Sequence, residues 1–280
     1  SGDYAGGIFG STQNTINGVY AYQYSENGKK DSDEETDYLI KGRSIIGGVI
    51  GEYGGSGSTF YNSKVTNSII LGTGNYVGAN CGNGASSTNN MVSTNNIILG
   101  ANYVGGNNGQ QGGWSGISAT SENNIIIATN DLNKVSDYKT KSATGSYVGG
   151  NYGNTGWSSV SNPVSRNNYI KGLDYVAGNV GRLNNNNATL DNSLSTGTNQ
   201  EIIGRNYVSG SVGWTNGRIK KLKVENCQVT ASGNYVGGAV GYNEYTNTSI
   251  STSNNSNYST AGAYVSNVTI IGSGYVGGIA

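Results

Sequence analysis

The stretch Tyr235-Val-Gly-Gly-Ala-Val-Gly241 contains the pattern that decides the fold of this 280-residue chain. The pattern reads aromatic–aliphatic–Gly–Gly–x–apolar–Gly. We call it the phrase and count its aromatic residue as position zero. Nine copies begin at residues 4, 45, 76, 103, 147, 175, 207, 235 and 275, the second imperfectly as Ile45-Ile-Gly-Gly-Val-Ile-Gly51. Self-similarity at spacings of 27 to 44 residues is typical of a repeat protein.

A second pattern precedes many of the phrases and has the composition of a β-strand. It reads Asn-Ser-Ile-Ile-Leu-Gly at 67–72 and Asn-Asn-Ile-Ile-Leu-Gly at 95–100, with related versions at 167–172 and 268–272. Ile and Val together number 43 against 9 Leu, and branching at Cβ favours strands over helices. Each repeat therefore contains two or three short strands joined by turns.

A repeat this thin cannot bury a hydrophobic face alone, but stacked repeats can supply each other's core and hydrogen bonds. The sequence predicts an all-β fold, a parallel β-helix (β-solenoid) of about eight coils of 27–44 residues. A β-propeller needs about four strands per blade, for which the shortest repeats leave little room. The usual crossover preference favours a right-handed helix. We expect one solenoid domain over residues 1–280, part of a longer array, with projecting loops near 25–37, 128–144 and 243–262.

Strand periodicity predicts which side chains of the phrase face inward. Positions one, three and five share one face, and they read aliphatic–Gly–aliphatic, so we expect Val104, Val148, Val176 and Val208 to be buried and in register. The aromatic at position zero would then point outward and stack with its copies. In the alternative, the chain bends before position one and the tyrosine lies inside. The glycine at position six is expected to turn a corner with positive φ.

Asparagine is the other abundant residue, with 41 copies. It tolerates the left-handed conformation and caps turns, and stacked copies can form amide ladders. We expect such ladders at Asn95-Asn96, Asn123-Asn124, Asn167-Asn168 and 184–187, with sugar recognition as the alternative. The glycine-rich phrase does not lead into a helix, which argues against a phosphate-binding loop.

The charge balance excludes several classes of protein. Lys+Arg and Asp+Glu number 16 each, so the chain lacks the clustered positive charge of a nucleic-acid binder. No apolar run is long enough to span a membrane. The chain has no His, the commonest general base.

Cys81 and Cys227 lie about five coils apart, too far for a disulfide in this fold, and are expected in the core.

The stretch Asp31-Ser-Asp-Glu-Glu-Thr-Asp37 concentrates carboxylates in a predicted loop. Oxygen ligands of this kind can hold calcium, which makes Asp31, Asp33, Glu35 and Asp37 weak candidate ligands. A solvated acidic loop is the favoured interpretation, since Thr36 stands where the EF-hand pattern requires Gly. We expect no other metal or cofactor.

Tryptophan and carboxylate positions bear on a carbohydrate-related function. Trp114, Trp157 and Trp214 each follow a phrase tyrosine by 7 to 11 residues, so they are candidates for glycan contact along one edge. Polysaccharide-active enzymes need paired carboxylates. The acids outside 31–37 form no pair at equivalent positions of adjacent coils, so we expect no catalytic residues and no enzyme.

Tyr235-Val-Gly-Gly-Ala-Val-Gly-Tyr-Asn243, Asp174-Tyr-Val-Ala-Gly-Asn-Val-Gly181 and Gly6-Gly-Ile-Phe-Gly10 resemble the GLUG repeat of secreted bacterial surface proteins. The resemblance covers the whole chain through its nine copies and implies an adhesin-like or filament-forming β-solenoid. It implies no catalytic residues. The chain departs from the usual motif where Leu is expected before the last apolar residue, because Ile8, Val49, Asn179, Ser211 and Ala239 stand there.

These observations predict a structural or adhesive extracellular protein of the cell surface or of a filament. Its expected partners are like repeats or copies of itself stacked end to end, because both ends of the chain lie nearly in phase within a phrase, and host or environmental glycans. The alternative is a carbohydrate-binding or carbohydrate-cleaving β-helix such as a tailspike or lyase. The sequence leaves open whether the sequons at Asn187, Asn247, Asn254, Asn257 and Asn267 carry glycans.

Overall fold

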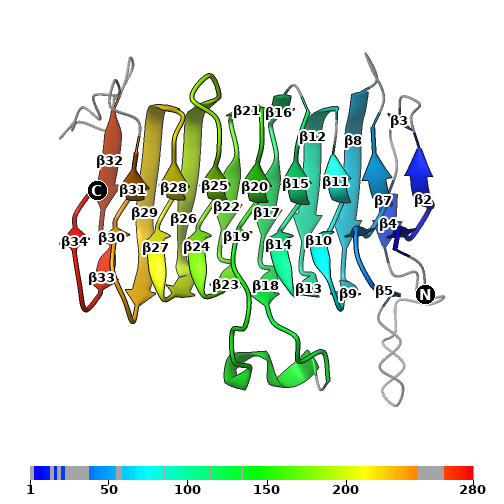
Figure 1. Ribbon diagram of the computed structural model, residues 1–280, viewed down its shortest axis with the longest axis horizontal. Helices are drawn as coiled ribbons and strands as arrows, with labels where there is room; N and C mark the ends of the chain where they lie inside the picture. The colour runs from blue at the N-terminus through cyan, green and yellow to red at the C-terminus, as the bar shows by residue number, and fades with distance from the viewer. Residues whose placement is uncertain are drawn as a thin grey trace.

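A computed structural model of the chain describes residues 3–12, 16–17, 20–22, 38–54, 59–84, 86–113, 115–133, 135–244 and 262–279. These residues form a β-solenoid whose coils follow one another along the longest axis of the molecule (Figure 1). All strand pairs within its three sheets are parallel, for example Val77 with Val104 and Val104 with Val148. The predicted fold class is confirmed.

The first half of every phrase contributes one strand to sheet A. Its nine strands occur in sequence order, so each coil hydrogen-bonds to the next. They are β1 (Ala5–Gly6), β6 (Ile46–Gly47), β10 (Asn75–Gly78), β14 (Asn102–Gly105), β19 (Val148–Gly149), β24 (Asp174–Ala177), β27 (Asn206–Ser209), β30 (Val236–Gly237) and β34 (Val276–Gly277).

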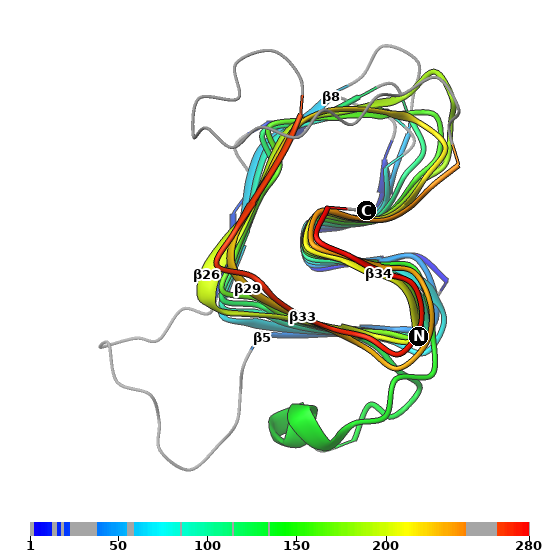
Figure 2. The same ribbon diagram turned by 90° about the vertical axis from the view of Figure 1, so that its left-hand side faces the viewer.

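The second half of the phrase forms sheet B, which has eight strands in the same order. They are β2 (Phe9–Thr12), β7 (Ile50–Tyr53), β11 (Cys81–Gly84), β15 (Asn108–Gln111), β20 (Tyr152–Thr155), β25 (Val180–Leu183), β28 (Val212–Thr215) and β31 (Val240–Asn243). Between sheets A and B the wall of the solenoid folds inward, which gives the cross-section its indented side (Figure 2).

Sheet C closes the rest of the cross-section with 17 strands. Those of the first coils are β3 (Ile16–Asn17), β4 (Tyr20–Tyr22), β5 (Tyr38–Gly42), β8 (Thr59–Thr66), β9 (Ser68–Gly72), β12 (Ser87–Thr94) and β13 (Ile97–Gly100). The middle coils supply β16 (Ser115–Ile117), β17 (Thr120–Glu122), β18 (Ile125–Ala128), β21 (Ser159–Ser161), β22 (Val164–Arg166) and β23 (Tyr169–Lys171). The last are β26 (Thr189–Gly204), β29 (Arg218–Ala231), β32 (Ala263–Ser266) and β33 (Thr269–Ile271).

The solenoid is right-handed. In Figure 2 the C-terminal end faces the viewer, and the chain runs from β32 down the left wall, along β33 and back through β34, which is counterclockwise. Counterclockwise motion that approaches the viewer defines a right-handed helix. The observed hand matches the prediction from the crossover preference.

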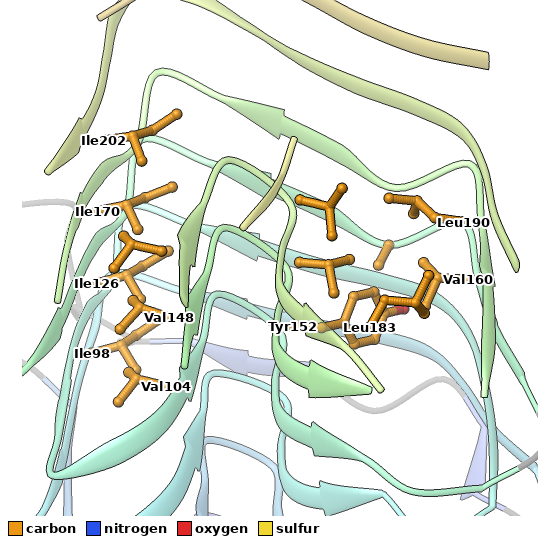
Figure 3. Close-up of a cluster of buried hydrophobic side chains, with 14 of the residues drawn as sticks. Ile98, Val104, Ile126, Val148, Tyr152, Val160, Ile170, Leu183, Leu190 and Ile202 are labelled. Carbon is orange, nitrogen blue, oxygen red and sulfur yellow. The ribbon is translucent and has the colours of Figure 1, made fainter. Parts of the chain in front are cut away.

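Aliphatic columns fill the interior. The position-one residues Val104, Val148, Val176 and Val208 have no exposed surface and pair in register, as predicted. The opposite wall supplies a second column, in which Ile98, Ile126, Ile170 and Ile202 also pair in register (Figure 3). The two columns supply much of the apolar burial that stabilises the described coils.

The corners are turned by three columns of left-handed residues. All 19 non-glycine residues with positive φ in the described chain belong to one of these columns. The first column holds Ile45 and the phrase tyrosines Tyr76, Tyr103, Tyr147, Tyr175, Tyr207 and Tyr235. The second holds Asn62, Asn90, Ser118, Asn162, Asn192 and Lys221, and the third holds Asn67, Asn95, Asn123, Asn167, Asn226 and Asn267.

The prediction that the glycine at position six turns a corner is wrong. The described glycines with positive φ are Gly197 and Gly262, neither of which occupies that position. Position six instead lies inside a sheet B strand, where a Cβ on Gly181 would come within 2.7 Å of the backbone of Tyr175 and Val148. Glycine is therefore required because the outer face of sheet B lies directly on the backbone of sheet A.

Buried amides form ladders inside the solenoid, as the sequence predicts for three of the Asn pairs. Asn96, Asn124 and Asn168 each accept a hydrogen bond from the backbone N–H one coil earlier, at 2.8–2.9 Å. A second ladder at position four joins Asn80, Asn107, Asn151 and Asn179 through side-chain bonds of 2.6–2.7 Å. Each of these four amides also donates to a carbonyl of sheet C, namely that of Val92, Thr120, Val164 or Leu194. The segment 184–187 forms a turn rather than a ladder.

Candidate functional site

A column of stacked tyrosines runs along the outside of the solenoid. We use the name tyrosine column for Tyr76, Tyr103, Tyr147, Tyr175, Tyr207, Tyr235 and Tyr275. Successive rings stack with centroids 4.5–5.2 Å apart and interplanar angles of 1–25°. The outward ladder is thus confirmed for these seven phrases. Tyr4 is separated from them by Ile45, which occupies position zero of the second phrase.

The column exists because two local requirements coincide. The residue at position zero must adopt φ between 54° and 64° in the six copies from Tyr76 to Tyr235, a conformation that costs a bulky side chain free energy. Parallel register at every coil then brings the rings within stacking distance, and each stacked pair stabilises the fold by about 0.5–1.5 kcal/mol. The stacking therefore offsets the backbone strain.

Stacking also determines which part of each ring faces solvent. Inside the column both ring faces are covered by neighbours, so the edges are exposed; Tyr275 is 70% exposed. Burial, followed by neighbouring phenols, raises the pKa of Tyr103 and Tyr175. The same two causes raise the pKa of Tyr207. These phenols remain neutral hydrogen-bonding groups well into alkaline solution.

A second column flanks the tyrosines from sheet B. It is formed by position seven of the phrase, where Glu52, Asn83, Gln110, Asn154, Arg182, Trp214 and Tyr242 pair in register. We call it the flanking column. Its composition changes along the axis from acidic and amide residues toward a cationic and aromatic end.

The aromatic end of the flanking column contacts the tyrosine column directly. The guanidinium of Arg182 lies 4.7 Å from the ring centroid of Trp214 and 5.7 Å from that of Tyr147. Trp214 meets Tyr175 edge to face at 6.4 Å, and Tyr242 meets Tyr235 in the same way at 5.0 Å. Cation–π and edge-to-face contacts of this kind fix the side chains in one arrangement.

The structure separates the tryptophans that the sequence proposed for glycan contact. Trp214 is 9% exposed and packs within the two columns, whereas Trp157 is 78% exposed in the turn between β20 and β21. Trp114 lies outside the described residues. The calcium candidates Asp31, Asp33, Glu35 and Asp37 also lie outside them.

Six of the described carboxylates form ion pairs, namely Asp3, Glu122, Asp131, Asp174, Glu201 and Glu225. Asp174 binds Arg205 of the next coil at 2.6 Å, and Asp3 binds Arg43 in the same relation at 2.5 Å. The hydrogen bonds from Arg43 hold the pKa of Asp3 below its usual range. Within the described ranges no group of three or more His, Cys, Asp or Glu residues could hold a metal ion.

Both cysteines are free thiols inside the solenoid. Cys81 occupies position five, and burial raises its pKa. Burial likewise raises the pKa of Cys227 to about 12. A thiol reacts as its thiolate, so both are unreactive in the folded chain at neutral pH.

Two of the sequons fall on described residues, in different surroundings. Asn187 is exposed in the turn between β25 and β26. The side-chain amide of Asn267 donates to Asn226 Oδ1 at 2.7 Å as part of the third corner column. A glycan on Asn267 would replace one hydrogen of an amide that is bonded within this corner column, whereas one on Asn187 would extend into solvent. Asn247, Asn254 and Asn257 lie outside the described residues.

The flanking column was not predicted from the sequence, although a signal was present. Position seven follows the last glycine of the phrase by one residue, and strict strand alternation would place it on the inner face with positions one, three and five. Its residue types vary from Glu52 to Tyr242, and this variation concealed the column. The polar residues Glu52, Gln110 and Arg182 at this position were the signal that the alternation breaks there.

Comparison with protein-family models, curated proteins and solved structures finds no match for this chain. Over the described residues no helix has the length and apolar character needed to cross a membrane.

Proposed function

We propose that the chain is a rigid, elongated module of an extracellular surface or filament protein with an adhesive role. The observation that carries this proposal is the register of sheet A, in which all nine phrases pair without interruption. Such a solenoid has one fixed cross-section, and its length is set by the number of coils. The resemblance of the phrase to GLUG repeats supports the same role.

The tyrosine column and the aromatic end of the flanking column form the surface that we propose for adhesion. They present aligned phenol edges together with Arg182 and Tyr242. Tyr, Trp and Arg are the side chains that carry most binding energy in protein interfaces. Rigid stacking lowers the entropy lost on binding, because the side chains are already ordered.

Further coils of the same kind, from this chain or from copies of it, are the proposed structural partners. Identical pairing recurs at every step of sheet A, for example Val148 with Val176 and Val236 with Val276. A phrase whose nine copies stack in eight steps can stack on another copy by the same bonds. Light scattering of the purified chain is expected to give masses above 28.9 kDa that increase with concentration.

The location can be tested in cells that produce the protein. Immunogold labelling with antibodies against the purified solenoid is expected to mark the outer surface of intact cells. Label confined to the cell interior would contradict the proposed location.

Adhesion is tested with beads that carry the chain. The double variant Arg182→Ala, Tyr242→Ala should weaken the attachment of the beads, and Asn186→Ala is the surface control.

A carbohydrate-binding or carbohydrate-cleaving β-helix is the second candidate function. The observation that favours it is Trp157, whose ring is 78% exposed and free to stack on a sugar. The test is a glycan array probed with the parent chain and with Trp157→Ala. Loss of a glycan signal in the variant would favour this candidate over a purely structural role.

A further inference from the structure

A cavity lies on the outer side of sheet C, away from the tyrosine column. It has a volume of about 290 Å³ and opens between the solenoid wall and a segment that we call the strap, residues 129–133 and 135–146. The strap contains η1 (Val135–Thr140), a 3-10 helix, and projects from the wall below β18 and β23 (Figure 1).

Two departures from the repeat coincide at this cavity. The strap belongs to the 44-residue coil, the longest of the chain. Two coils further on, the register of β26 shifts between Thr196 and Gln200, and Gly197 there adopts φ of 123°. The shifted segment brings Asn199 and Glu201 to the cavity opposite Lys139 of the strap.

The strap is held firmly enough to act as a fixed wall. Lys141 is 3% exposed, forms an ion pair with Asp131 at 3.4 Å and donates to the carbonyl of Asn133. Lys171 of β23 donates to the carbonyl of Lys141 at 2.5 Å. The ring of Tyr138 meets Tyr169 edge to face at 5.3 Å. A preformed wall reduces the free energy lost on ligand binding.

The side chains that line the cavity are both aromatic and polar, and together they carry no net charge. Tyr138 and the small part of Tyr169 that remains exposed (9%) supply ring surface, and Asn123, Asn167 and Asn199 supply amide donors and acceptors. Lys139 and Glu201 lie 3.9 Å apart and compensate each other's charge. An anion, a cation or a purely apolar ligand would each leave part of this wall unsatisfied.

We propose that this cavity binds a neutral saccharide, with one or two sugar units seated against Tyr169 and Tyr138. A sugar has apolar C–H faces for the rings and hydroxyl groups that both donate and accept, which matches the amides and the Lys139–Glu201 pair. Ligand pockets range from about 300 to 1,000 Å³, so this cavity suits a small ligand or a chain end. The proposal goes beyond the adhesive role, because it requires only the folded chain.

Saturation-transfer NMR on the purified chain tests the proposal. The probes are glucose, galactose, mannose, N-acetylglucosamine and their disaccharides, each added separately. At least one is expected to receive saturation from the parent chain. Tyr138→Ala, Asn199→Ala and Glu201→Gln should each weaken its binding about tenfold or more, since each removes a direct contact.

The control is Asn186→Ala, an exposed amide in the turn between β25 and β26, which should bind as the parent does. Unchanged melting temperatures would show that the variants are folded. Absence of saturation for every sugar would overturn the proposal, and so would equal binding in all variants. Loss of binding only in Trp157→Ala would also overturn it, because binding would then belong to the exposed tryptophan. None of these outcomes depends on where the protein is located.

Discussion

Gly181 illustrates how closely the two halves of a phrase approach each other. A Cβ at this position would lie 2.5 Å from the carbonyl oxygen of Gly153 and 2.7 Å from that of Tyr175. Both atoms belong to hydrogen-bonded backbone, so neither can move without breaking a sheet. The glycine is needed for space, whereas its conformational freedom is unused.

Gly181→Ala is therefore expected to destabilise the solenoid by about 1–3 kcal/mol, the usual cost of overpacking. Gly156→Ala is the matched control, because the nearest atom to its Cβ would be 3.6 Å away. Urea denaturation of both variants measures the difference. Equal midpoints for Gly181→Ala and the parent chain would contradict the steric argument.

Tyr147 is suited to separating stacking from backbone conformation. Its ring lies 4.5 Å from Tyr103 and 4.7 Å from Tyr175. Tyr147→Asn keeps a residue that tolerates positive φ but removes both stacked pairs, so a loss of about 1–3 kcal/mol is expected. Tyr275→Asn removes one pair from an exposed ring and should have the smaller effect on the melting temperature. The reverse order would show that backbone conformation, and not stacking, decides the stability.

Residue types predicted the facing of the phrase better than they predicted its corners. The alternation of apolar residues was sufficient to predict that Val176 is buried and that the tyrosines face outward. The corner prediction failed because it assigned positive φ to the residue best able to adopt it, glycine. The actual corner residues, mostly Asn and Tyr, are stabilised by contacts with the coils above and below, such as Asn90 with Asn62 at 2.8 Å. A single repeat does not reveal such contacts.

At the scale of strands, the buried amide ladders link each coil to its neighbours. Asn124 accepts from the backbone N–H of Asn96 at 2.8 Å and donates to the carbonyl of Ser93 and the hydroxyl of Ser121, both at 2.9 Å. All of these groups are away from water. Removing the amide would leave the N–H of Asn96 without its acceptor and the hydroxyl of Ser121 without this donor, and the carbonyl of Ser93 would lose one of its hydrogen bonds.

Asn124→Ala is accordingly expected to lower the free energy of unfolding by about 2–4 kcal/mol, since each orphaned buried group costs about 1–3 kcal/mol. Hydrogen exchange should rise first at the amide N–H of Asn96. Asn186→Ala, which removes an exposed amide, should leave both measurements unchanged. Unaltered exchange at Asn96 in the Asn124→Ala chain would argue against the ladder.

The sequence could indicate that Asn96, Asn124 and Asn168 stack, because each precedes a similar strand. It could not indicate the ladder from Asn80 to Asn179, since position four also holds Val49 and Ala239. The cavity was equally hidden: it arises where the strap and the shifted register of β26 meet, two coils apart. Features that join one coil to a later one require the register, which only the structure provides.

For the whole molecule, the absence of His predicts a broad range of pH over which stability is constant. The pKa of Asp3 is lowered by hydrogen bonds from Arg43, and that of Asp131 by the backbone N–H of Asn133. A lowered pKa stabilises the fold above the unfolded value of about 3.9, and this contribution is lost as the pH falls further. The melting temperature should therefore stay level from about pH 8 to pH 5 and fall below about pH 4.

The stability of the fold at alkaline pH depends on the groups whose pKa is raised on folding. Such groups favour the folded state below their unfolded pKa and lose this contribution as the pH rises, because the unfolded chain then ionises first. Burial raises the pKa of Cys81 and raises that of Cys227 to about 12, against about 8.5 for an exposed thiol. Tyr103 and Tyr175 act in the same direction above about pH 10, and Lys171, whose pKa burial lowers, acts in the opposite one.

Stability should consequently begin to fall near pH 8.5, where only the thiols of the unfolded chain ionise. The double variant Cys81→Val, Cys227→Ala removes this contribution, and Val fits position five because Val180 and Val212 already occupy it. Its alkaline limit is expected to move up to about pH 10, where unfolded tyrosines ionise. Melting temperatures of the parent chain and the variant between pH 7 and pH 11 measure the shift. Identical profiles would contradict the argument, because they would mean that unfolding does not move the two buried thiols into water.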